Sequence, residues 1–588
     1  MAIRDYTLLA EQPVSSNDLT QKERDEIVIS AVLDDAGQRL VLSRYSDMVW
    51  ELWPFFDQAN VQPARKRIDW SGMPAQFREP CKAVLYRYWM MGTPGVERPN
   101  ASTLVRMASA QLQVVKYLDS RRLTSLLDVH PLHIANFLHE QRTTKGVGAA
   151  GIAKQCQAIE LWHRFGSEHP EHLTFHPWPD ESIGEVAGTG SGNSGSPAGK
   201  TPLIPKDVVA LLYRYAESIL ERAGATLDER DAGLRSAVTD VAVIRIRDAC
   251  FFLLGLLTGM RCDEIAGVSV GAGRTEVKDG VTYYWVKSIE HKTKKGPVEY
   301  LMPSVGLTIL RVMERWSYPL RERLRMQLAA LEADTAAAGR PDRLRRIAAA
   351  RSDINKLFLS LPRSHAGITT VSGIGWHKTM RKFAVEAGTD WLLAPHQLRR
   401  TYAWTFVRHR LGNMLFLKEQ FKHSSLAMTQ LYAANPQQDP ALYDEILNEM
   451  REFKVELIQH WMDAEVPLSG GAGKKIMALR AHAFDSRKEL IEDTAEQVHI
   501  RSNGHAWCLA QDEGCGGAGL YERTRCAGCS DGCIDDSQAP VWQEIYAHQM
   551  ELVEDAKECG PGAQQRVERD CKVARQVLTD LGMEPCAG

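Results

Sequence analysis

The sequence predicts a multidomain, mainly α-helical protein with a mixed α+β central domain that contains a small antiparallel sheet, followed by a cysteine-rich extension. Three observations predict this. The length of 588 residues suits three or four domains. Residues 184–200 are rich in glycine and serine and cannot pack a core, so they predict a flexible linker. Eight of the 12 cysteines follow residue 507, so the end of the chain forms a distinct part.

Composition excludes several classes of protein. Hydrophobic residues make up 44% of the chain and charged residues 25%, which is ordinary for a globular protein and unlike a disordered or collagen-like chain. The longest apolar run, residues 249–257, is far shorter than the roughly 20 residues that cross a bilayer. The N-terminus has no basic region followed by an apolar stretch, so we expect a cytoplasmic protein with no membrane partner.

The net charge of −3 averages two unlike parts. Residues 1–484 contain 61 Lys/Arg and 54 Asp/Glu, whereas residues 485–588 contain 10 and 20. Residues 287–325 carry nine Lys/Arg against four Asp/Glu. Local basic surface, rather than whole-chain charge, attracts phosphates, so these residues indicate either a nucleic-acid contact or a solvated helix face.

Two segments precede the linker. Residues 1–95 predict an N-terminal module of unassigned role, with a small hairpin around the turn at 34–37, and a DNA-binding arm domain is one interpretation of it. Apolar residues near a 3.6 period predict a compact helical domain over residues 96–183. These apolar positions are Leu104, Val105, Ala108, Leu112, Val115, Leu118, Ile134, Phe137, Leu138, Ile152, Cys156, Ile159 and Trp162.

A central domain is predicted over residues 201–460. Residues 205–222 and 249–257 predict helices, and the second ends where Gly259 interrupts the pattern. Two β-rich runs, residues 281–286 and 298–302, flank a basic turn with glycine and predict a hairpin. Residues 316–356 predict an inserted helical hairpin.

Four short segments of this domain carry the residue types that phosphodiester transfer without a metal needs. Two arginines offer bidentate forks for the phosphate, two histidines donate hydrogen bonds or exchange protons, and a lysine protonates the leaving oxygen. A tyrosine serves as a covalent nucleophile, because its phenolate is also a good leaving group in the reverse step. The segments are residues 258–265, 291–295, 396–399 and 423–432.

Their order, R-x-x-E, a hairpin lysine, H-x-x-R, then H with Y nine residues later, resembles the catalytic domain of the tyrosine recombinases, the phage integrase family. The resemblance covers about residues 200–450. It implies that Lys292 is the hairpin lysine, with Lys294 as the alternative, and that Tyr432 is the nucleophile. Lys422 stands where the family commonly has glycine. The other implied catalytic residues are Arg261 with its supporting Glu264, His396, Arg399 and His423.

The same resemblance gives the other domains a role. It implies that residues 96–183 are a helical core-binding domain and that the linker passes around duplex DNA. The implied activity is that of a site-specific recombinase or integrase of a mobile genetic element. The implied partners are DNA with specific recombination sites, further copies of the chain as a dimer on each site and a tetramer in the synapse, and other recombination proteins of the element.

The cysteines of residues 461–588 predict a structural zinc site in an acidic extension. A C-x2-C pair with two further cysteines upstream is typical of tetrahedral zinc, and no cofactor is expected for catalysis. The alternative interpretation is free thiols in a loosely ordered extension. The first choice of ligands is Cys508, Cys515, Cys526 and Cys529, with Cys533 and His505 as substitutes.

The sequence is also compatible with three other functions. A type IB topoisomerase shares the nucleophile chemistry but rejoins the same strand. An accessory protein could keep the fold and bind DNA without catalysis. A zinc-dependent nuclease is less well supported, because the cysteine cluster lacks the carboxylates and open position of a catalytic metal site.

Overall fold

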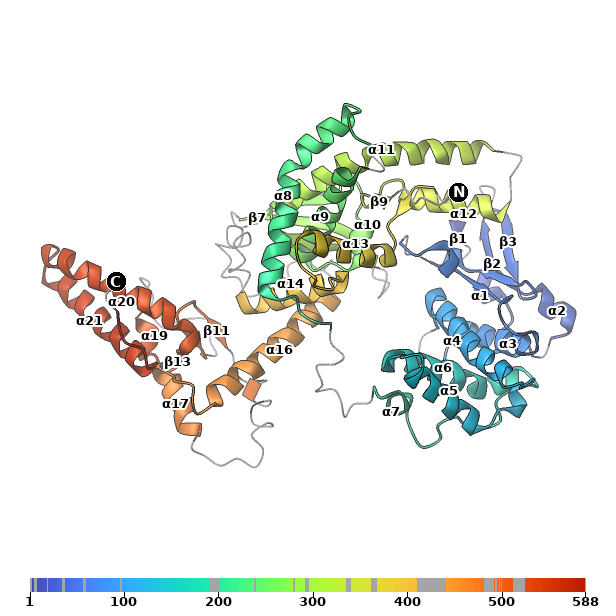
Figure 1. The fold of residues 1–588 in the computed structure, drawn as a ribbon, viewed down its shortest axis with the longest axis horizontal. Coiled ribbons are helices and arrows are strands. Elements are labelled where there is room, and N and C mark those ends of the chain that lie inside the picture. The colour runs from blue at the N-terminus through green and yellow to red at the C-terminus, as the bar shows by residue number, and fades with distance from the viewer. Residues whose placement is uncertain are drawn as a thin grey trace. The chain divides into compact units, whose positions relative to one another are not determined.

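The structure is a computed structural model, and its chain divides into two compact units (Figure 1). One unit comprises residues 1–402, and the other includes residues 440–588. The structure describes residues 3–4, 8–17, 19–33, 37–56, 60–95, 98–189, 201–236, 240–278, 281–290, 296–334, 340–360, 367–409, 440–480, 491, 494–495, 498, 500–510 and 524–586.

The N-terminal module combines two small antiparallel sheets with helices. The predicted hairpin is confirmed, because β2 and β3 pair around the turn, and β1 pairs with β2 to make three strands. Trp50 in β4 and Trp70 directly after β5 pack edge to face, with ring centroids 4.9 Å apart. The elements are β1 (Ile3–Arg4), α1 (Leu8–Glu11), α2 (Gln21–Glu26), β2 (Val28–Leu33), β3 (Arg39–Arg44), β4 (Val49–Glu51), β5 (Arg67–Asp69) and α3 (Ala75–Met91).

A buried lysine holds two elements of this module together. The Lys82 side chain on α3 is only 1% exposed, and its Nζ donates hydrogen bonds to the backbone carbonyls of Tyr45, Ser46 and Asp47, at 2.9, 3.3 and 3.2 Å. The ammonium also lies over the Tyr45 ring, 5.6 Å from its centroid. Since buried charge needs such compensation, Lys82 ties the turn after β3 to α3.

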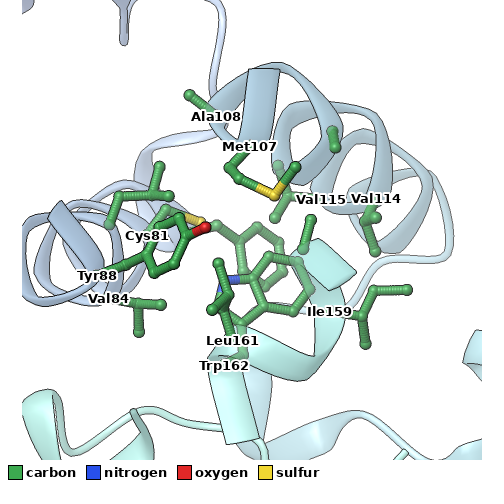
Figure 2. Packing of buried hydrophobic residues seen from close by; sticks show 14 of the residues in the cluster. Cys81, Val84, Tyr88, Met107, Ala108, Val114, Val115, Ile159, Leu161 and Trp162 are labelled. Carbon is green, nitrogen blue, oxygen red and sulfur yellow. The ribbon is translucent and has the colours of Figure 1, made fainter. Parts of the chain in front are cut away.

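A helical bundle follows, as the apolar periodicity predicts. One hydrophobic cluster runs continuously from Ile27 to Ala187, so α3 shares a core with the helices after it. Figure 2 shows Trp162 of α6 among side chains of α3 and α4, such as Cys81 and Met107. The helices are α4 (Ala101–Ser120), α5 (Pro131–Thr143), α6 (Ala149–Arg164) and α7 (Ile183–Ala187).

Helix α7 occupies the first residues of the segment predicted as a linker. Ser182 and Glu185 form a reciprocal capping box at its start, and Ala187 is buried in the bundle core. These local interactions outweigh the glycine-rich composition there. Residues 190–200 of the predicted linker lie outside the described residues.

The central domain surrounds a buried helix, α9, which ends at Gly259 in the left-handed conformation, as predicted. The predicted hairpin is confirmed as β7 and β8, and β6 adds a third antiparallel strand. The inserted hairpin is also present, with α11 and α12 side by side (Figure 1). The elements are α8 (Lys206–Asp231), α9 (Val241–Thr258), α10 (Cys262–Gly267), β6 (Gly273–Lys278), β7 (Val281–Glu290), β8 (Gly296–Met302), α11 (Val305–Ala333), α12 (Pro341–Asp353), β9 (Leu359–Ser360), β10 (Thr369–Thr370), α13 (Gly373–Glu386) and α14 (Pro395–His409).

The second unit includes α16, although the sequence analysis assigns residues 440–460 to the central domain. The apolar face of α16 explains this, because Ile458 and Trp461 pack in one cluster with Leu468 and Cys533. Helices α20 and α21 form an antiparallel pair with a second cluster. The elements are α16 (Pro440–Met462), α17 (Gly470–Arg480), β11 (Arg501–Ser502), β12 (Trp507–Cys508), α19 (Arg525–Gly528), β13 (Gly532–Cys533), α20 (Ala539–Glu558) and α21 (Pro561–Asp580).

None of the helices in the described part of the chain is both long and apolar enough to cross a membrane.

We predict that Lys82→Met destabilises the N-terminal module. The substitution keeps the buried stem but leaves three carbonyls without their charged donor, so the local free energy of unfolding should fall by about 2 kcal/mol. Amide hydrogen exchange in peptides that cover residues 44–48 and α3 measures this change. Lys116→Met, on the exposed face of α4, is the matched control. Equal exchange in both variants would contradict the role of the buried ammonium.

Candidate active site

The first arginine motif lies where two helices meet. The backbone leaves α9 through Gly259, whose φ of 68° favours glycine, and then enters the short helix α10. Arg261 is the N-cap residue of α10, and its backbone N–H donates to the Glu264 carboxylate at 2.5 Å. The Arg261 guanidinium donates to the other carboxylate oxygen at 2.7 Å. This reciprocal box fixes the arginine against its own helix.

Glu264 is a buried carboxylate that faces two arginines. It is fully buried, and its Oε2 lies 3.9 Å from Nη1 of Arg399. Burial raises the pKa of the Glu264 carboxyl, and the positive charges of Arg261 and Arg399 oppose that rise. The carboxylate therefore links two cations from segments that are 138 positions apart in the sequence.

Arg399 is itself fully buried, at 0% exposure. Its guanidinium donates to the carbonyl of Gly259 at 3.1 Å, so it also contacts the turn before Arg261. A glycine in α9 makes the close approach possible: a Cβ added to Gly255 would come within 2.8 Å of Leu398, the residue before Arg399. Packing of α14 on α9 thus sets the position of this arginine.

His396 lies one turn before Arg399 on α14 and is exposed. Residues three apart share a helix face, so the histidine lies on the same side of α14 as the buried guanidinium. The structure therefore brings together Arg261, Glu264 and Arg399, with His396 exposed in the first turn of the helix that carries Arg399. The other sequence candidates, Lys292, Lys294, His423 and Tyr432, lie outside the described residues.

Two donors that the motifs do not contain hold the far end of α10. Ser288 of β7 donates its hydroxyl to the carbonyl of Glu264 at 2.6 Å. Lys356, after α12, donates from Nζ to the carbonyl of Gly267 at 2.5 Å. The last carbonyls of a helix lack intrahelical partners, so these two side chains complete it. No spacing rule in the sequence indicated either residue.

The described cysteine candidates lie in and beside the small sheet of the second unit. Cys508 is in β12, Cys526 and Cys529 are in and just after α19, and all three are partly exposed. Cys533 in β13 is fully buried in a hydrophobic cluster, and burial raises the pKa of its thiol to about 12. Cys515 lies outside the described residues. Within the described ranges, no three or more His, Cys, Asp or Glu side chains form a group that could hold a metal ion.

Residues 234–439 match the model of the phage integrase family. This range contains every candidate active-site residue. The central domain is a phage integrase domain. Within this domain, the family match points to the chemistry of a tyrosine-type site-specific recombinase. The candidate residues within the matched range are Arg261, Glu264, Lys292, Lys294, His396, Arg399, His423 and Tyr432.

Solved structures similar to the chain include XerH site-specific recombinase bound to palindromic difH substrate in a post-cleavage complex. That match has 14% identity, covers 57% of this chain and 77% of that chain, and has a TM-score of 0.31. XerH bound to difH in a pre-cleavage complex matches with 14% identity, 60% and 81% coverage, and a TM-score of 0.32. XerA recombinase matches with 15% identity, 63% and 98% coverage, and a TM-score of 0.20. The search of curated proteins finds no match.

We predict that Glu264→Gln slows strand cleavage by about 10- to 100-fold, because Arg261 loses the carboxylate that orients it. The raised pKa means that acid protonates Glu264 at a higher pH than an exposed glutamate. As the pH falls toward this raised pKa, wild-type cleavage should therefore decline at a pH above the ordinary range of a glutamate, with a contribution that the glutamine variant lacks. Cleavage rates against pH measure both effects.

Glu168→Gln is the matched control, because Glu168 is also buried and paired with an arginine, Arg87, but lies outside the integrase domain. Its pH profile should remain that of the wild type. A Glu264→Gln enzyme with unchanged rate and profile would show that the buried carboxylate does not orient the arginine.

Proposed function

We propose that this protein cuts and rejoins DNA at specific sites through a 3′-phosphotyrosine intermediate. The observation that carries the proposal is the buried Glu264 between Arg261 and Arg399 inside a phage integrase domain. Two fixed guanidinium groups with one shared counter-charge suit the charge that develops on a phosphate under attack. Buried donors of this kind are preorganised, so they need no rearrangement during the reaction.

In the proposed reaction, the Tyr432 oxygen attacks the scissile phosphorus and forms a phosphotyrosine bond as its phenolic proton passes to solvent water. The bond from phosphorus to the 5′ oxygen breaks, and that oxygen takes a proton from Lys292, or from Lys294 as the alternative. Arg261, Arg399, His396 and His423 stabilise the pentacoordinate phosphate. A 5′-hydroxyl of a partner strand then reverses the step.

The proposed context is a mobile genetic element. The helical bundle α4–α7 would hold DNA together with the integrase domain, and four copies on two duplexes would exchange strands through a four-way junction. Other recombination proteins of the element are further proposed partners. Two competing functions, a type IB topoisomerase and a catalytically inactive DNA-binding protein, differ in testable ways: the first relaxes supercoiled plasmid without target sites, and the second forms no covalent adduct.

We predict that the full chain forms a covalent adduct with a nicked suicide duplex from the end of its element, and that Tyr432→Phe abolishes the adduct. The phenylalanine keeps the ring but lacks the attacking oxygen. Denaturing gels detect the adduct. Tyr318→Phe removes an exposed hydroxyl from α11 and is the matched control. Site-specific binding by the wild type without an adduct would favour the accessory-protein function.

We also propose that the second unit binds a structural Zn²⁺ ion through Cys508, Cys526 and Cys529, with Cys515 as the fourth ligand. Several contacts of the described cysteines support this. Cys508 pairs with Gly532 across β12 and β13, and a Cβ on Gly532 would lie 3.5 Å from that of Cys529. Directly paired residues project to the same face, so both cysteines lie on one side of the sheet.

The Cys526–Cys529 pair has two features typical of thiolate metal ligands: a tight turn between the cysteines and a hydrogen-bond donor to sulfur. The backbone N–H of Cys529 donates to the Cys526 carbonyl at 3.3 Å, which closes a tight turn. Nδ2 of Asn503 donates to Sγ of Cys526 at 3.0 Å, and such donors orient ligands and compensate thiolate charge. Cys533, buried on the opposite face, is a core residue. His505 remains the alternative fourth ligand. Thiolate ligands in a tetrahedral arrangement favour zinc.

We predict about one Zn²⁺ per purified full-length chain, measured by elemental analysis, and a cobalt–thiolate absorption band after metal exchange. Cys526→Ser should lose the metal, and Asn503→Ala should weaken binding by about 10- to 100-fold. Cys559→Ser, at an exposed cysteine of the same unit, is the matched control. A wild type without metal, or a Cys526→Ser variant that retains it, would contradict the site.

A further inference from the structure

The short helix α10 depends on contacts from outside itself. It has six residues and presents Arg261 and Glu264 at its start, so any tilt of the helix displaces both side chains. A helix this short has little stability of its own. At its C-terminal end, the carbonyls of Glu264 and Gly267 accept hydrogen bonds from Ser288 and Lys356, respectively.

Lys356 is the charged member of this pair. Its Nζ donates a hydrogen bond to the Gly267 carbonyl at 2.5 Å, and a cation at the negative end of a helix is favourable. The two donors meet at one point: a Cβ on Gly267 would lie 3.4 Å from Oγ of Ser288 and 3.8 Å from Nζ of Lys356. The lysine therefore contacts the end of α10 beside β7.

The backbone around Lys356 is fixed as well. Lys356 forms a β-bridge with Ser269, and the N–H groups of Val270 and Leu357 donate across the same two segments, to Asn355 and Val268 at 2.9 and 3.0 Å. These bonds attach the chain that follows α12 to the residues that follow α10. The Lys356 side chain therefore extends from a segment whose backbone is held by hydrogen bonds on both sides of it.

A buried carboxylate stands near the lysine. Asp353 is 4% exposed and accepts hydrogen bonds from the backbone N–H and the hydroxyl of Thr370, at 2.8 and 2.7 Å. It attracts the Lys356 ammonium, which burial alone would favour in its neutral form. Asp353 thereby helps the lysine to keep its charge at the end of α10.

We propose that Lys356 is a positioning residue for the recombinase active site: it holds the C-terminal end of α10 and so sets where Arg261 and Glu264 lie. The proposal rests on the proposed strand-cleavage function for its kinetic consequence, but the mechanical role is independent of it. Lys356 acts through the helix that carries the arginine.

The first test measures α10 directly, without DNA. In Lys356→Met, the amide hydrogens of residues 262–270 should exchange about tenfold faster than in the wild type, while Lys356→Arg, which keeps a cation, restores most of the protection. Arg346→Met, at an exposed arginine of α12, is the matched control. Unchanged exchange in Lys356→Met, or an equal increase in Arg346→Met, would overturn the proposal.

The second test uses the cleavage reaction of the full chain on a suicide duplex. Lys356→Met should slow adduct formation by about 10- to 100-fold with unchanged DNA affinity, and Lys356→Arg should recover most of the rate. Combined with Arg261→Lys, the loss should be smaller than the product of the two single losses, because both act on one arginine. Multiplicative losses, or a matching loss of DNA affinity, would overturn the proposal.

The two tests separate this proposal from the proposed function. If the wild type formed no adduct, strand cleavage would fail as a function, and hydrogen exchange would still decide the role of Lys356. If the wild type formed the adduct and Lys356→Met formed it equally fast with unchanged exchange, only the positioning role would fail.

Discussion

The arrangement of the integrase domain depends on one buried carboxylate. Glu264 is fully enclosed, and a charge without compensation there would cost several kcal/mol. Its compensation comes from Arg261 on its own helix and from Arg399 on α14. The two arginines in turn need Glu264, because without it two largely buried cations would lie near one another without a counter-charge. The α9–α10 turn and α14 are therefore held together by a requirement of charge as well as by apolar packing.

Apolar packing of α14 against α9 brings Arg399 close enough to contact Glu264. Helix α9 is buried along most of its length, and its Gly255 leaves room for Leu398 of α14. A larger residue at that glycine would push α14 outward and draw Arg399 away from Gly259 and Glu264. The carbonyl bonds from Ser288 and Lys356 act at the opposite end of α10. The site is thus fixed from both ends of a six-residue helix that could not stand alone.

Buried charged side chains also link elements in the other parts of the chain, but with a different kind of compensation. In the N-terminal module, the buried Lys82 is satisfied by three carbonyls. In the second unit, the carboxylate of Asp535 is fully buried, and one of its oxygens accepts hydrogen bonds from the indole N–H groups of Trp461 and Trp507, each at 2.8 Å. Each of these ions links elements that are distant in sequence, and neutral dipoles rather than an opposite charge supply most of the compensation.

The sequence by itself predicted many of the elements and named the candidate residues of the site. Periodicity and glycine punctuation are local signals, so they predicted the helical bundle, the end of α9 and the β7–β8 hairpin, and motif order pointed to the integrase family, which the comparison bears out. Tertiary structure alone decided which residues share a core and what holds α10. Lys356 bonds to a carbonyl 89 positions earlier in the chain, and such a contact leaves no trace in spacing. Likewise, α16 joined the second unit because its apolar face found partners there, which composition could not foresee.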